Sequence, residues 1–153
     1  MSLITAIGET LTLEGSDCSA GVSNIMTDVK YYESKIIPIG NDTDGATVLY
    51  RCAPSSSADT SGGIIYDNDK VVYARITNLH ATEWCDISIE TGTGDDSWLQ
   101  FKIGPGGSFI IANHDDWGGD SYSSSWQRQV GTVEATGPDG VNVDVEVFIG
   151  LNA

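Results

Sequence analysis

The sequence predicts an all-β protein, an antiparallel β-sandwich of about eight to ten strands with a jelly-roll-like arrangement. Three observations lead to this fold class. Apolar and polar residues alternate with a period of two in several short segments. Turn-forming glycine, proline, asparagine and aspartate recur between these segments, about every ten residues. No window of the sequence shows the period of an amphipathic helix.

The length of 153 residues favours one domain, which we place over residues 1–153 because no linker or internal repeat interrupts them. The first segment, residues 1–15, is apolar and carries few charges. Two interpretations stay open: it is the first strand of the sandwich, or it is an N-terminal arm. As an arm, its apolar residues Leu3, Ile4 and Ile7 would help it to add a strand to the exposed sheet edge of a partner.

The first half of the chain contains four further candidate strands. We expect strands at 28–34, 35–39 and 46–52, and a short or edge strand at 63–67. A turn at 41–45 and a loop at 54–62 separate them, as their glycine, serine and aspartate content indicates.

The second half gives clearer alternation. Residues 70–79 are rich in β-branched side chains, and 84–91 place Cys85, Ile87 and Ile89 on one face. Residues 98–111 form two apolar-alternating runs around Gly104-Pro105-Gly106-Gly107, which predicts a β-hairpin. A second hairpin is predicted between 129–136 and the valine-rich strand 141–149, joined by a proline-aspartate-glycine turn.

One segment, residues 113–127, breaks this rhythm. It is long, polar and rich in glycine and serine, yet it carries Trp117, Tyr122 and Trp126. Long loops of this kind tend to be functional or disordered, and three large aromatic side chains argue against disorder. The aromatic residues either cap an end of the sandwich or contact another subunit, a scaffold surface or a glycan.

The charge is strongly negative, with 22 acidic and 7 basic residues and a net charge of −15. Such a surface repels phosphate and anionic lipid, so we expect no direct nucleic-acid or membrane partner. No run of residues is long and apolar enough for a membrane span, and the N-terminus lacks the features of a signal peptide. The three cysteines, without a C-x-x-C pair, favour free core thiols over a disulfide framework.

No motif in the sequence supports catalysis or a cofactor, and a metal site stays open only as a loose cluster at Asp95-Asp96 or around Asp115, Asp116 and Asp120. Residues 40–51 resemble a calcium loop only at its centre, because Gly40 and Arg51 stand where two essential carboxylates belong. The two histidines, His80 and His114, are predicted to be ordinary surface or turn residues. The adjacent Asp115 and Asp116 have poor geometry for a glycosidase pair. We therefore predict a protein that is not an enzyme.

Four stretches carry a resemblance to a known class of proteins: "VVYARITNLHATEWCDISIE", "SWLQFKIGPGGSFII", "VNVDVEVFIGLN" and, near the start, "DVKYYES". Together they resemble small β-sandwich virion structural proteins of tailed bacteriophages. The resemblance implies a head decoration, or cement, protein that self-associates, most often as a homotrimer. Its partner would be the major capsid protein or another virion protein. Its location would be the virion, assembled in the host cytoplasm.

Two alternatives to a decoration protein remain open. Relatives associated with the phage tail, neck or fibre look similar in sequence. A lectin-like module is the other alternative, in which Trp117, Tyr122 and Trp126 would stack on sugar faces. The residues predicted to contact a partner are these three aromatics together with Leu3, Ile4 and Ile7 of the N-terminal segment.

Overall fold

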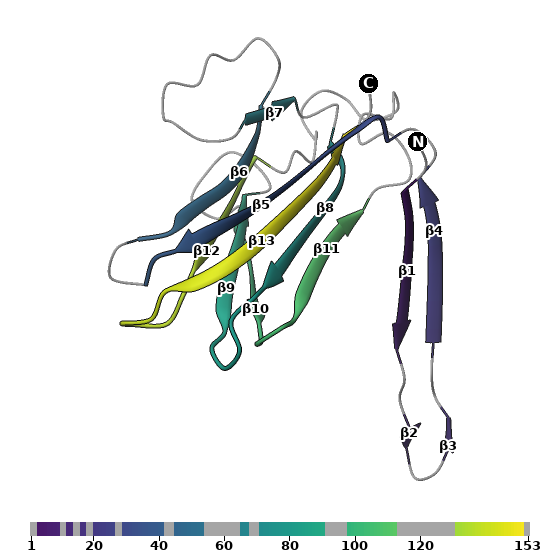
Figure 1. Cartoon of the computed structure of the whole chain (residues 1–153), viewed down its shortest axis with the longest axis horizontal. Coiled ribbons are helices and arrows are strands. Elements are labelled where there is room, and N and C mark those ends of the chain that lie inside the picture. The colour runs from purple at the N-terminus through teal and green to yellow at the C-terminus, as the bar shows by residue number, and fades with distance from the viewer. Residues whose placement is uncertain are drawn as a thin grey trace.

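The computed structural model is built from two face-to-face β-sheets and a separate N-terminal hairpin (Figure 1). The strands that it describes confirm the all-β sandwich, and no helix occurs among the described residues. These residues are 3–9, 12–13, 16–17, 20–26, 29–41, 45–53, 65–67, 71–90, 98–112 and 131–151.

The first sheet has five strands in the order β10-β9-β12-β6-β7. Their bounds are β10 Trp98–Ile103, β9 Cys85–Glu90, β12 Thr132–Thr136, β6 Thr47–Ala53 and β7 Ile65–Asp67. The second sheet has four strands in the order β11-β8-β13-β5. Their bounds are β11 Ser108–Ala112, β8 Val71–Asn78, β13 Val143–Leu151 and β5 Tyr31–Ile39. All neighbours are antiparallel except β6 and β7, which run parallel.

The pairing of these strands is that of a jelly roll. Apart from the short β7, the strands pair from the two ends of the sandwich sequence toward its middle. The first strand, β5, pairs with the last, β13, and the next pairs are β6 with β12, β8 with β11, and β9 with β10. The chain is therefore one long antiparallel ribbon that is folded over into two layers. This confirms the jelly-roll-like arrangement that the sequence predicts.

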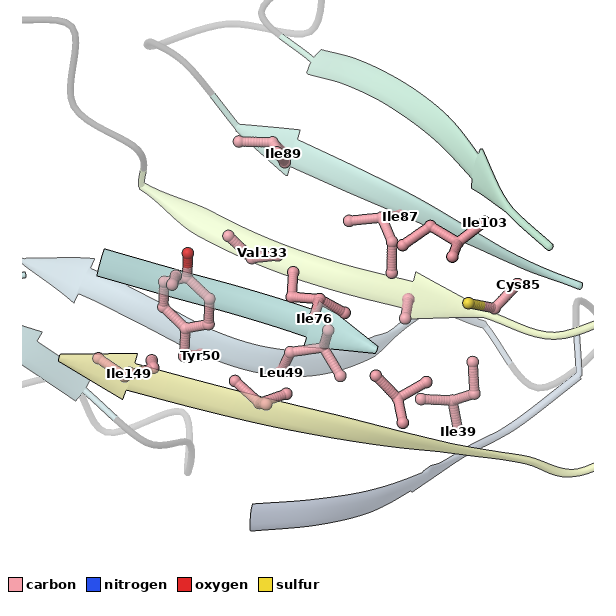
Figure 2. Close-up of a cluster of buried hydrophobic side chains, with 14 of the residues drawn as sticks. Ile39, Leu49, Tyr50, Ile76, Cys85, Ile87, Ile89, Ile103, Val133 and Ile149 are labelled. Carbon is pink, nitrogen blue, oxygen red and sulfur yellow. The ribbon is translucent and has the colours of Figure 1, made fainter. Parts of the chain in front are cut away.

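Alternating residues of both sheets fill the space between them (Figure 2). On β9, Cys85, Ile87 and Ile89 are buried while the residues between them are partly exposed. On β13, every second residue from Val143 to Ile149 is buried in the same way. Each fully buried aliphatic side chain contributes about 1.5–3 kcal/mol relative to an exposed one, so this period-two pattern is what holds the layers together.

The two predicted hairpins are wrong. Strands β10 and β11 lie in different sheets, and so do β12 and β13, so each proline-glycine turn carries the chain across the sandwich. Gly106 and Gly140 take φ values of 66° and 73°, the left-handed conformation that glycine favours. A left-handed glycine can occur in a hairpin turn or in a turn that crosses from one sheet to the other. Which of the two forms depends on the strands with which the flanking segments pair. The described hairpin partner of β10 is β9.

The predicted strands 28–34 and 35–39 are one continuous strand, β5. Pro38 lies within it, and the strand tolerates a residue without an N–H because β5 is the last strand of its sheet. The expected short strand at 63–67 is present as β7, at the edge of the first sheet.

Asn78, at the end of β8, is a fully buried polar residue, the one such residue outside the N-terminal hairpin in the described part of the chain. Its Nδ2 donates to the backbone oxygens of Glu83, Ile103 and Gly104, at 2.8, 3.3 and 3.2 Å. Its Oδ1 accepts the backbone N–H of His80 at 2.9 Å. Asn78 thus links the turn after β8 to the turn after β10, and so joins two corners of the sandwich.

His80 belongs to the same corner. Its Nδ1 accepts the backbone N–H groups of Thr82 and Glu83, at 3.3 and 2.9 Å. This confirms the prediction of a turn histidine for His80, whereas His114 lies outside the described residues.

The N-terminal segment pairs with neither sheet of the sandwich. Strand β1 (Leu3–Glu9) pairs along its whole length with β4 (Ala20–Met26), and β2 (Thr12–Leu13) pairs with β3 (Ser16–Asp17) nearer the tip. Figure 1 shows this hairpin extending away from the two sheets. In this arrangement β1 is part of a projecting hairpin and not a strand of either layer.

Candidate functional site

Two exposed apolar surfaces are the candidates for contact with a partner. We call them the β5 strip (Tyr31, Tyr32 and Ile36) and the open edge (Trp98, Leu99 and Phe101). The N-terminal hairpin (β1 to β4), which lies outside both sheets, is a further candidate element. Large apolar side chains that remain outside a completed core are typical of contact surfaces when they gather in one place.

The β5 strip lies on the edge strand of the second sheet. Tyr31, Tyr32 and Ile36 are 65%, 61% and 63% exposed. Tyr32 and Ile36 share one face of β5, because they are four residues apart on a strand of period two. The ring of Tyr32 stacks on Phe148 of β13, with centroids 5.8 Å apart, so this part of the strip is held in place by its neighbour.

Phe148 connects the β5 strip to a second, smaller apolar cluster on the outer face of the sheet. It meets Tyr73 edge to face at 5.9 Å, and Tyr73 is buried together with Val29. The Arg75 guanidinium lies over the Phe148 ring at 5.5 Å and pairs with Glu146 at 2.9 Å. This face is therefore an ordered surface with both aromatic and charged groups.

The β5 strip is not among the interaction residues predicted from the sequence. A usable signal is present, because Tyr32 and Ile36 are out of phase with Ile37 and Ile39, which pack toward the core. Splitting the segment into two strands after residue 34 concealed this phase. Large apolar residues on the face of a strand that points away from the core indicate an exposed apolar surface such as the β5 strip.

The open edge lies where the two sheets end at β10 and β11. Leu99 and Phe101 stand opposite Ile89 and Ile87 in the ladder, which places them on the core-facing side of β10. They are nevertheless 52% and 37% exposed. Phe101 stacks on Phe109 of β11, with centroids 4.7 Å apart, and this contact bridges the two sheets. The face predicted for Leu99, Phe101 and Ile103 exists, but only Ile103 is buried.

The predicted interaction residues fall into two groups. Leu3, Ile4 and Ile7 all lie on β1, where the register sets them opposite Met26, Ile25 and Val22 of β4. Trp117, Tyr122 and Trp126 lie outside the described residues, as does Cys18. The structure therefore places the first three on one hairpin.

One cluster of ionisable groups joins β5 to β7. Glu33 of β5 pairs with Lys35 and accepts a hydrogen bond from the Tyr66 hydroxyl of β7. These two partners lower the pKa of Glu33, and burial together with Glu33 raises the pKa of Tyr66. The contact joins the two sheets at the edge opposite β10 and β11. No group of three or more metal-ligating side chains occurs among the residues that the structure describes.

Both described cysteines are free thiols that pack with the core. Burial raises the pKa of Cys52 to about 12. Burial and the neighbouring Asp86 carboxylate raise the pKa of Cys85 to about 11. Since the thiolate is the reactive form, both side chains act as small apolar core residues, as the sequence predicts.

We expect these thiols to be unreactive in the folded protein. In a Cys18→Ser variant, an aromatic disulfide reagent at about pH 8 should leave Cys52 and Cys85 unmodified for as long as the fold persists. Adding denaturant should expose both cysteines to the reagent. The absorbance of the aromatic thiolate that the reagent then releases gives the number of cysteines that have reacted. Rapid modification of either cysteine before denaturation would contradict their placement in the core.

Comparisons with known proteins assign no family to this chain. No protein-family model matches it, and no curated protein matches it. Within the described part of the chain, no helix is long and apolar enough to cross a membrane.

Proposed function

We propose that the protein is a virion structural subunit of a tailed bacteriophage, with capsid decoration as its role. In this role it binds the major-capsid lattice and stabilises it through self-association and surface contacts. The residues that carry the resemblance occupy β5, β8, β9, β10, β11 and β13. They are therefore mostly framework residues of the sandwich, and the resemblance concerns architecture.

The observation that carries the proposal is the presence of apolar contact surfaces outside a completed core. The β5 strip and the open edge expose large side chains on a body whose net charge of −15 otherwise favours solubility. A cement subunit needs this combination, a rigid soluble body with local adhesive surfaces.

The acidic composition also fits the outer surface of a particle. The inner surface of a capsid meets packaged nucleic acid, from which a strongly negative subunit would be repelled. A subunit on the outside avoids that repulsion and adds to the colloidal stability of the particle.

The test is reconstitution on particles of the phage whose genome encodes the chain, prepared with this gene deleted. Purified protein is expected to sediment with these particles, to saturate, and to raise the temperature at which they release nucleic acid. Particles that already carry the protein are the matched control, because their sites are filled and should take up no more.

The position of the bound protein separates decoration from the alternatives. Electron microscopy of the reconstituted particles should show added density on the heads. Density on tails, necks or fibres would favour the tail-associated role and reject decoration. Absence of binding to any part of the particle, or an encoding gene without virion genes near it, would contradict the proposal.

A further inference from the structure

Strand β5 is the longest strand at a sheet edge of the sandwich among those that the structure describes. It has nine residues, whereas the other edge strands, β10, β11 and β7, have six, five and three. Strand β13 pairs with one side of β5 and lies beside it in Figure 1. The other side of β5 has no strand partner within the described part of the chain. A long open edge of this kind is a template for pairing with another chain.

The backbone groups on this open side belong to the even-numbered residues of β5. The Leu79 N–H donates to the backbone oxygen of Asp144 at 2.9 Å, so the even-numbered residues of β13 turn their backbone groups toward β8. The odd-numbered residues of β13 therefore turn theirs toward β5, where the register sets them opposite odd-numbered residues. The N–H groups of Tyr32, Ser34 and Ile36 consequently point away from the sheet.

Proline and lysine often protect an open edge from pairing, and β5 contains one of each. Pro38 is an even-numbered residue near the end of the strand, so its missing N–H costs no bond to β13 and leaves the preceding outward groups free to pair. The side chain of Lys35 lies on the face opposite to Tyr32 and Ile36, and it pairs with Glu33. Neither residue blocks the edge between 32 and 36.

The side chains beside this edge define what a partner strand must carry. Residues of an added strand opposite Tyr32 and Ile36 would lie next to them on the outer face, where these two side chains are 61% and 63% exposed. The Tyr32 ring is already fixed by its stacking on Phe148. Residues opposite Glu33 and Lys35 would lie on the other face, beside an ion pair. A matching strand therefore alternates, with two apolar residues four positions apart.

The charge of the body distinguishes between possible partners. Residues 28–153 contain 19 of the acidic residues and all 7 basic ones, a net charge of −12. A second copy carries the same charge and is repelled, whereas a basic segment is attracted. The complementary strand therefore belongs to a different protein.

We infer that the open edge of β5 binds an extended, basic segment of another protein as an additional strand of the second sheet. The segment accepts hydrogen bonds from the N–H groups of Tyr32, Ser34 and Ile36, donates to the carbonyl oxygens on the same edge, and packs apolar side chains against the β5 strip. The inference rests on the proposed function, in which the segment is part of the major capsid protein, and it names the contact by which the subunit is held.

The test compares two proline variants of the full-length protein in sedimentation with the gene-deleted particles. Ser34→Pro removes an outward N–H from β5. Ser108→Pro makes the same change at the opposite edge of the same sheet. Its backbone groups also point outward, because the Asn78 N–H donates to the oxygen of the preceding Gly107. Far-UV circular dichroism and thermal unfolding check that both variants keep the fold.

We expect Ser34→Pro to weaken binding at least about 10-fold, because it removes one hydrogen bond and leaves a carbonyl group of the partner unpaired. Ser108→Pro should bind as the wild-type protein does. Hydrogen exchange measured by mass spectrometry should show slower exchange in β5 once the wild-type protein is bound, since its outward amides become paired. Added salt should weaken binding, because it screens the attraction between the acidic body and the basic segment.

A second pair of variants tests the side chains and does not depend on proline. Ile36→Lys and Leu79→Lys both replace an exposed aliphatic side chain, 63% and 46% exposed, with a lysine. Only Ile36→Lys should weaken binding, because it removes an apolar contact and sets a positive charge beside a basic strand. This pair decides the question if Ser34→Pro does not fold.

Failure of this inference is distinguishable from failure of the proposed function. Particle binding at wild-type strength by Ser34→Pro and Ile36→Lys, or unchanged exchange of β5 in the bound protein, would reject strand addition and retain virion binding. A dimer in solution that Ser34→Pro dissociates and Ser108→Pro does not would overturn the inference by placing a second copy on the edge. A wild-type protein that binds no particle would reject the proposed function, and this partner for β5 with it.

Discussion

Replacing Asn78 by Asp is expected to destabilise the folded protein by about 3 kcal/mol or more, although the two side chains have nearly the same shape. The Nδ2 group now donates toward three backbone oxygens, those of Glu83, Ile103 and Gly104. A carboxylate in its place would face these oxygens with no hydrogen to donate. The residue is fully buried, so water cannot replace the lost donor.

The destabilisation should depend on pH. Burial and the surrounding carbonyl oxygens favour the protonated form of the new carboxyl group, so its pKa is raised in the folded state. The protonated form therefore stabilises the fold at pH values below the pKa of the unfolded chain. This contribution is lost as the pH rises through the folded pKa. Relative to wild type, the variant should consequently be least impaired in acid.

Denaturant unfolding of Asn78→Asp from about pH 4 to pH 8 measures both effects. The matched control is Asn142→Asp, which makes the same chemical change at an exposed position and should alter stability by less than about 0.5 kcal/mol. Equal stability of the two variants near neutral pH would show that Asn78 does not join the two corners.

Replacing Ile76 by Ala should remove about 3 kcal/mol from the free energy of unfolding. Ile76 lies on β8, between β11 and β13, and is 0% exposed in the core between the sheets (Figure 2). The substitution removes buried apolar atoms, and with them their favourable transfer free energy. It also leaves a cavity, which cannot collapse fully because β8 is hydrogen-bonded to a strand on each side. The melting temperature should fall by about 10 °C.

Ile36→Ala is the control for this substitution, because it removes the same atoms from a side chain that is 63% exposed. Its effect on stability should stay within about 0.5 kcal/mol. Thermal unfolding followed by circular dichroism compares the three proteins. If the two alanine variants melted together, Ile76 could not lie at the centre of the core.

The layers of the sandwich were predictable because alternation is a local property. Val143, Val145 and Val147 show which face of β13 is buried without reference to any other strand. The pairing of strands is not local. Gly106 and Gly140 identify turns correctly, yet the same left-handed glycine serves a hairpin and a sandwich corner. The choice between them depends on strands far away in the chain.

The candidate surfaces were predictable to different degrees. Leu3, Ile4 and Ile7 stood out because they are apolar residues near one end of an acidic chain. Their assembly into a hairpin depends on β4, a segment to which the sequence analysis assigned no strand. The exposure of Leu99 and Phe101 was not predictable from alternation, because they have the phase of core residues. Their exposure follows from their position at the end of both layers.

The folded-ribbon topology has a consequence for the order in which the chain can acquire its structure. Strand β5 is the first described strand of the sandwich, yet its described sheet partner is β13, which is synthesised after all the other described strands. Contacts between such distant segments carry a large loop-closure cost, and folds dominated by them form slowly. The body therefore closes only after translation has delivered β13, and until then β5 presents an unpaired edge.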